Sequence, residues 1–136
     1  MSDLQETRVV HVRDNLPGAV YIGRAMPRQR LKASPFANPH KIGASHPKFE
    51  GEGQGGVLAR YDAVRLYSWD LFAGDKTAMF ADLPELRGKP LACWCRHDGE
   101  ERTPDNECHG DVLVALLETY TDLELRAMAK EANHAD

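Results

Sequence analysis

The chain lacks any long apolar run, and none of its hydrophobic stretches approaches the ~20 residues that a membrane-spanning helix needs. Residues 1–6 show neither the basic nor the apolar region of a secretory signal. We therefore expect a cytoplasmic protein with no membrane contact. In that reducing compartment the three cysteines are expected to be ligands or thiols rather than disulfides.

The composition does not resemble that of a disordered chain, in which apolar residues are scarce. Apolar residues make up 42% and charged residues 28% of the 136 positions, which is an ordinary globular balance. A chain of this length fits one domain. We expect that domain to span residues 1–136, with an ordered core over about 7–132 and a frayed tail at 133–136.

Acidic residues are absent from residues 16–48, although this segment holds six Lys/Arg. Residues 1–48 carry 8 basic and 3 acidic residues, whereas residues 49–136 carry 9 and 18. The basic segment indicates either a local site for phosphate or a nucleotide, or a solvated face that pairs with acids elsewhere. The net charge of −4 argues against general coating of nucleic acid.

Hydrophobic periodicity predicts alternating strands and helices. Strands are expected at 7–12, 19–23 and 89–94, and helices at 57–72, 77–86, 111–120 and about 122–132. This alternation predicts an α/β fold, a small single domain with a mostly parallel sheet flanked by helices in a Rossmann-like three-layer arrangement. In such folds a ligand site forms where strands end and helices begin.

All three cysteines fall within 16 residues, as Cys93-x-Cys95, twelve residues, and then Cys108-His109. They fit a [4Fe–4S] cluster whose fourth iron is open to His109, Asp111, water or substrate. They also fit zinc with His109 as fourth ligand. Without metal, Cys108 is a candidate nucleophile of lowered pKa, or the thiols are ordinary and buried. We favour iron–sulfur over zinc, because the tight Cys-x-Cys spacing and the adjacent Cys108 and His109 hinder tetrahedral coordination.

A proline-restrained loop supplies a second group of candidate ligands. Its Asn38 amide is suited to fixing a turn or contacting a ligand edge. His40 and Lys41 are suited to neutralising a phosphate, with Arg24 as a bidentate partner from the end of the second strand. The alternative is a structural loop whose Phe36 fills the core.

Four motifs span most of the chain, namely VYIGR at 20–24, SPFANPHKIG at 34–43, LRGKPLACWC at 86–95 and CHGDVL at 108–113. Over about residues 8–118 the chain resembles the domain-of-unknown-function family 4326 of bacteria and phages. The resemblance implies a small α/β domain but no particular reaction. The family's linker between Cys-Trp-Cys and Cys-His is usually short, whereas here it has twelve residues.

These features together predict a metal-centre protein with a [4Fe–4S] cluster on Cys93, Cys95 and Cys108. A cationic pocket beside it is expected to bind a phosphorylated or nucleotide-like small molecule. In an enzyme acting on such a substrate, the open iron would act as a Lewis acid and His109 or Asp111 would move protons. The alternatives are a nucleic-acid-binding module with structural zinc and a nucleotide sensor without catalysis.

Overall fold

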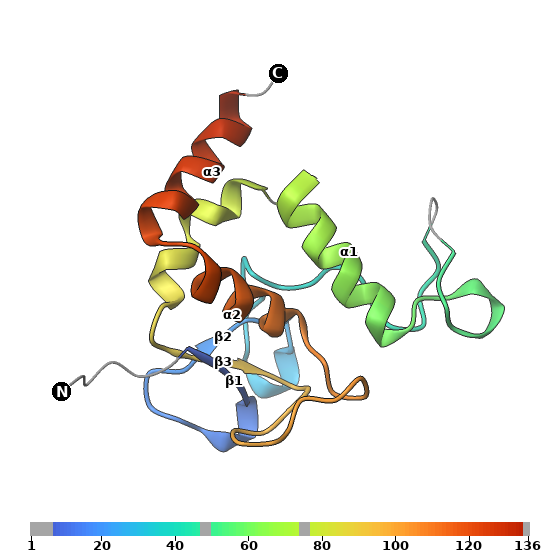
Figure 1. Cartoon of the computed structure of the whole chain (residues 1–136). Helices are drawn as coiled ribbons and strands as arrows, with labels where there is room; N and C mark the ends of the chain where they lie inside the picture. The colour runs from blue at the N-terminus through green and yellow to red at the C-terminus, as the bar shows by residue number, and fades with distance from the viewer. Residues whose placement is uncertain (1–6, 47–49, 74–76, 135–136) are drawn as a thin grey trace.

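The computed structural model describes residues 7–46, 50–73 and 77–134, and within them it contains a three-stranded parallel sheet and three α-helices (Figure 1). The strands are β1 (Arg8–His11), β2 (Val20–Tyr21) and β3 (Pro90–Cys93). The helices are α1 (Arg60–Ala73), α2 (His109–Thr119) and α3 (Asp122–His134). The predicted α/β class and parallel sheet are confirmed.

The sheet has the order β1-β3-β2, so the last strand in sequence is the central one. Leu91 of β3 pairs with Val9 of β1 on one side and with Val20 of β2 on the other. All four residues of β3 are buried, which suits its apolar sequence. Pro90 is tolerated because it is the first residue of the strand, where its missing N–H disturbs the ladder least. The central strand therefore ends at Cys93.

The three α-helices lie on the same side of the sheet in the view of Figure 1, and α2 is the nearest to it. The start of α2 approaches the sheet region closely because it carries a glycine. A Cβ at Gly110 would lie 2.8 Å from Ile22 Cδ1 and 3.0 Å from Val9 Cγ2. The Rossmann-like three-layer arrangement is not confirmed.

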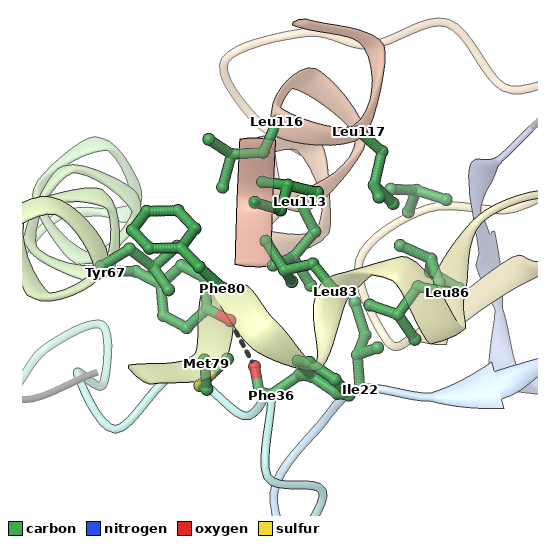
Figure 2. Packing of buried hydrophobic residues seen from close by; sticks show 14 of the residues in the cluster. Ile22, Phe36, Tyr67, Met79, Phe80, Leu83, Leu86, Leu113, Leu116 and Leu117 are labelled. Atoms are coloured by element: carbon green, nitrogen blue, oxygen red, sulfur yellow. Dashed lines mark hydrogen bonds between the residues drawn. The ribbon is translucent and has the colours of Figure 1, made fainter. Parts of the chain in front are cut away.

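The hydrophobic core lies between the sheet, the three α-helices and residues 77–86 (Figure 2). Tyr67 of α1 is fully buried, and its hydroxyl donates a 2.7 Å hydrogen bond to the carbonyl of Phe36. Phe36 is itself only 4% exposed, as the structural interpretation of its loop predicted. The same loop is tied to α1 by Asn38, whose Nδ2 donates to the Ala63 carbonyl at 2.9 Å. The loop of candidate ligands is thus anchored in the core.

Several elements differ from the prediction. The helix expected from residue 57 begins at Arg60, because Leu58 exchanges backbone hydrogen bonds with Gly43 and Ala44 instead. The helix expected at 77–86 is two 3-10 segments, Thr77–Ala81 and Leu83–Leu86. Pro84 lacks the N–H that a continuous α-helix would need there.

The C-terminal helix runs to His134, two residues beyond the predicted end, and residues 135–136 of the expected frayed tail lie outside the described residues. In the part of the chain that the structure describes, no helix has the length and apolar character needed to cross a membrane.

Candidate functional site

The three cysteines converge at one edge of the sheet. Their Sγ atoms all lie within 4.8 Å of one another, and no disulfide joins them. Cys93 ends β3, Cys95 follows it in the loop, and Cys108 is the N-cap of α2, with its sulfur accepting from the Gly110 N–H at 3.4 Å. A strand end and a helix start therefore bring together sulfurs that are separated in sequence. The predicted cysteine cluster is confirmed.

The three thiols share protons unevenly. The pKa of Cys95 is lowered to about 2, because the thiols of Cys108 and Cys93 form hydrogen bonds with its sulfur. The pKa of Cys108 is raised, because its thiol is held by Cys93 and Cys95 and is buried. This direction is opposite to the lowered pKa that the sequence interpretation of Cys108 as a nucleophile expected. The hydrogen bonds among the three thiols therefore favour a negative charge on Cys95 over one on Cys108.

Arg60 is a functional candidate that sequence reasoning missed. It is the first residue of α1, and its Nη1 lies 3.5 Å from Cys95 Sγ and donates to the Glu107 carbonyl at 3.1 Å. The guanidinium thereby stabilises the thiolate and connects α1 to the residue preceding Cys108. Its position inside the helix predicted at 57–72 gave no signal, because the contact joins residues that are 35 positions apart in the sequence.

His109 lies beside the cluster but outside the three-sulfur group. Its Nε2 donates to the Ile22 carbonyl at 2.7 Å, so its Nδ1 is the nitrogen that lies 3.7 Å from Cys108 Sγ. Burial lowers the pKa of His109, which keeps the ring neutral at pH 7. The ring is therefore fixed in one tautomer with an unprotonated nitrogen toward a cysteine.

Asp111 is held in a buried ion pair. Its carboxylate accepts two hydrogen bonds from Arg96, at 2.5 and 3.0 Å, and a third from the Cys108 N–H at 2.9 Å. The Arg96 and Asp111 side chains are only 8% and 6% exposed. Asp111 therefore fixes the backbone of Cys108, and Arg96 fixes Asp111. No role was predicted for Arg96 from the sequence.

A pocket of about 610 Å³ adjoins the cysteines. It is lined by the three cysteines and His109, by the four candidate ligands of the basic segment, and by Arg60, Tyr21 and Trp94. The predicted ligand residues that line it are Arg24, Asn38, His40 and Lys41. Asp111 does not line it. The fold therefore places two groups of candidates, predicted from separate motifs, around one hollow.

The four basic-segment residues differ in what they are free to do. Asn38 accepts from the His40 N–H at 3.0 Å, and His40 Nε2 lies 2.7 Å from Asp70 Oδ2, so both side chains are engaged in holding the loop. The side chains of Arg24 and Lys41 are exposed and have no hydrogen bond or ion pair with the described residues. These two cations are the ones available to a ligand.

The twelve-residue insertion is held by hydrogen bonds and does not cover the pocket. Arg96 donates to the Asn106 carbonyl at 3.2 Å, and Asn106 Nδ2 donates to the Glu101 carbonyl at 2.9 Å. Of the insertion, residues 96–107, only Glu107 lines the pocket. Most of the insertion therefore lies outside the hollow.

The fold and the site define a small α/β protein with a cluster of three cysteines at the edge of a parallel sheet, beside a pocket. Over residues 6–119 the chain matches the family described as Domain of unknown function (DUF4326), and it belongs to that family. The predicted resemblance is confirmed. Comparison with curated proteins and with solved structures gives no match.

Proposed function

We propose that Cys93, Cys95 and Cys108 hold a metal centre with one open coordination position, that this centre is a [4Fe–4S] cluster, and that the adjoining pocket binds a phosphorylated or nucleotide-like ligand. The observation that carries the proposal is the convergence of the three sulfurs within 4.8 Å. Three free thiols at one point are the donor set that iron–sulfur clusters and zinc both prefer.

The number of donors favours an open centre. Among the described residues, no His, Asp or Glu joins the three cysteines in the group of ligand atoms. A closed structural zinc site requires four protein ligands. Three cysteines in a [4Fe–4S] cluster leave one iron without a protein ligand, and all three cysteines line the pocket. The open position would therefore be available to a ligand in the pocket.

A single zinc ion is the second candidate, and the sulfur spacing favours it. Thiolates on one tetrahedral zinc, at ~2.3 Å from the ion, lie about 3.8 Å apart. A cluster places each cysteine on a different iron, so its sulfurs must spread further than they do around one ion. A cluster therefore requires the three sulfurs to move apart, whereas zinc requires little movement.

The surrounding residues have separate roles in this proposal. The bound centre supplies a Lewis acid. Arg60 stabilises thiolate charge, and Asp111 positions the Cys108 backbone through its hydrogen bond. His109 is the candidate for proton transfer, through the Nδ1 that carries no proton when Nε2 donates to the Ile22 carbonyl. Arg24 and Lys41 attract the phosphate.

Anaerobic purification followed by an absorption spectrum and analysis of iron, sulfide and zinc tests the proposal. We expect a brown protein that absorbs broadly near ~400 nm and contains iron and sulfide. A colourless protein with one zinc per chain would replace the cluster by the second candidate. A protein that takes up neither metal would refute the metal centre.

Single substitutions distinguish a shared centre from isolated thiols. We expect Cys93→Ala, Cys95→Ala and Cys108→Ala each to lose the absorption and most of the metal, because each removes one of three ligands. Ser45→Ala, an exposed hydroxyl that does not line the pocket, is the control and should keep both. Full metal content in any one of the three cysteine variants would contradict the proposed ligand set.

A further inference from the structure

A tight turn at residues 26–31 places further arginines outside the pocket. Residues 26–31 close on themselves through backbone hydrogen bonds between Met26 and Leu31, at 2.9 and 3.1 Å, and between Arg30 and Pro27, at 3.0 Å. Pro27 restrains one side of the turn, and Arg30 adopts a left-handed φ of 58°, which is uncommon for a residue with a side chain. The turn is therefore a defined platform.

This turn adjoins the pocket and carries exposed cations. Met26 lines the pocket, and Arg28 and Arg30 belong to the same turn. Both arginines, and Lys32 after them, are exposed. Their side chains make no hydrogen bond or ion pair with any residue that the structure describes. Since residues 16–48 contain no carboxylate, nothing in this segment neutralises them.

The pocket wall beside the turn is aromatic. Trp94 Nε1 donates to the Tyr21 hydroxyl at 3.2 Å, and that hydroxyl donates to the Arg24 carbonyl at 2.5 Å. The Tyr21 ring folds over Gly23, where a Cβ would lie only 2.5 Å from the hydroxyl. These contacts fix the aromatic side chains of Trp94 and Tyr21 in the pocket wall, next to the backbone of Arg24.

We infer that the pocket accepts one nucleotide of a single-stranded nucleic acid, whose flanking phosphates bind Arg28 and Arg30. This inference rests on the proposed nucleotide-binding pocket and names its substrate class. The phosphate of a free nucleotide needs only Arg24 and Lys41, whereas the cations of the turn lie outside the pocket. Phosphates that flank the bound nucleotide would explain why the cations extend beyond the pocket onto the turn.

The strand must be single because a base inside a pocket has to be unstacked, and aromatic walls bind unstacked bases. The charge balance of the chain favours the basic segment as the phosphate contact. Residues 49–136 carry 18 acidic against 9 basic residues, a net negative charge that disfavours phosphate. A duplex would need to extrude a base before it could enter.

Fluorescence anisotropy with labelled single-stranded RNA and DNA of about ten nucleotides tests the inference, with the full chain purified anaerobically. We expect binding that weakens steeply with salt. In Arg28→Ala/Arg30→Ala the slope of log K against log salt should fall in magnitude by about 1.4, because two phosphate contacts are lost at ~0.7 each. Arg126→Ala/Lys130→Ala is the matched control, since it removes two exposed cations of α3, which does not line the pocket.

The outcomes separate this inference from the proposed function. Mononucleotide binding should survive in Arg28→Ala/Arg30→Ala while oligonucleotide binding falls, and the metal content should be unchanged. If the wild-type chain binds mononucleotide but no oligonucleotide more tightly, the pocket stands and the inference fails. The inference also fails if the slope of log K against log salt falls by the same amount in both double variants. It fails as well if the chain binds anionic lipid vesicles but neither the RNA nor the DNA oligonucleotide.

Discussion

The Arg96–Asp111 pair is the most buried ion pair among the described residues, and it holds the backbone on which Cys108 sits. Asp111→Asn keeps an acceptor for the Cys108 N–H but leaves the Arg96 guanidinium buried without an opposite charge. Because an uncompensated buried charge is costly, we expect a loss of about 3–5 kcal/mol in the free energy of unfolding. Urea denaturation followed by circular dichroism measures it.

Asp122→Asn provides the matched control for that change. It also removes the carboxylate partner of an arginine, but the Arg87 and Asp122 side chains are 39% and 41% exposed. Solvent screens such a pair, so we expect a loss of about 0–1 kcal/mol. If both variants lost the same free energy of unfolding, the buried pair would contribute no more to stability than the exposed one.

The sequence predicted the role of the cysteines, because clustered thiols are typical metal ligands. It did not predict which residues from distant segments would contact them. The cysteines cluster within 16 residues, so their convergence follows from one strand, one loop and one helix start. Arg60 and Arg96 carry no such mark, because an arginine on a helix or in a charged loop is usually solvated. Only the fold shows that Arg60 reaches Cys95 and that Arg96 reaches Asp111.

Helix α2 is the element whose placement sets the cluster, because its N-cap is Cys108. Gly110→Ala would place a methyl 2.8 Å from Ile22 Cδ1 and 3.0 Å from Val9 Cγ2, both on buried side chains. Overpacking of this kind costs about 1–3 kcal/mol, which exceeds the ~1 kcal/mol that alanine gains over glycine in a helix. We therefore expect net destabilisation and weaker metal retention, measured by thermal denaturation and by metal analysis after dialysis.

Ala115→Gly measures the propensity contribution separately, because Ala115 is exposed on the same helix. We expect it to destabilise α2 by about 1 kcal/mol and to leave the metal content unchanged. A more stable Gly110→Ala variant with full metal content would show that α2 can move away from the sheet without disturbing Cys108.

The elements that sequence predicted well are those whose pattern has one structural solution. The buried run at β3 and the apolar face of α2 were found nearly at their observed bounds, 90–93 and 109–119. The stretch 77–86 was wrongly predicted as one helix, because the pattern of its apolar residues does not distinguish an α-helix from two 3-10 turns around Pro84. The side of the sheet that each helix covers was also beyond the sequence, since amphipathic helices fit either face.

Across the whole molecule the site depends on contacts between distant segments. The basic segment supplies one side of the pocket, and α1 supplies Arg60. The sulfurs come from the end of β3, from the loop after it and from the N-cap of α2. This explains why the anion site and the cysteine site were predicted as neighbours only through the general rule that strand ends and helix starts form crevices.

One such long-range connection joins the end of β1 to the insertion and makes the stability depend on pH. Asp14 accepts from His97 Nδ1 at 2.6 Å, from the Asp98 N–H at 2.7 Å and from the His11 N–H at 2.9 Å. The hydrogen bond from His97, followed by those from the two backbone N–H groups, lowers the pKa of Asp14 to about 2. A depressed carboxyl pKa contributes stability above its unfolded value of about 4, and the contribution disappears as the pH falls toward 2.

We therefore expect Asp14→Asn to melt at a lower temperature than the wild type at pH 5, with the difference shrinking between pH 4 and pH 2. Both proteins are melted after metal removal, so that acid release of the metal does not enter the comparison. Asp105→Asn removes one negative charge from the exposed insertion and controls for the change in net charge. A difference between the wild type and Asp14→Asn that is constant from pH 5 to pH 2 would show that the carboxylate charge of Asp14 does not hold the insertion against β1.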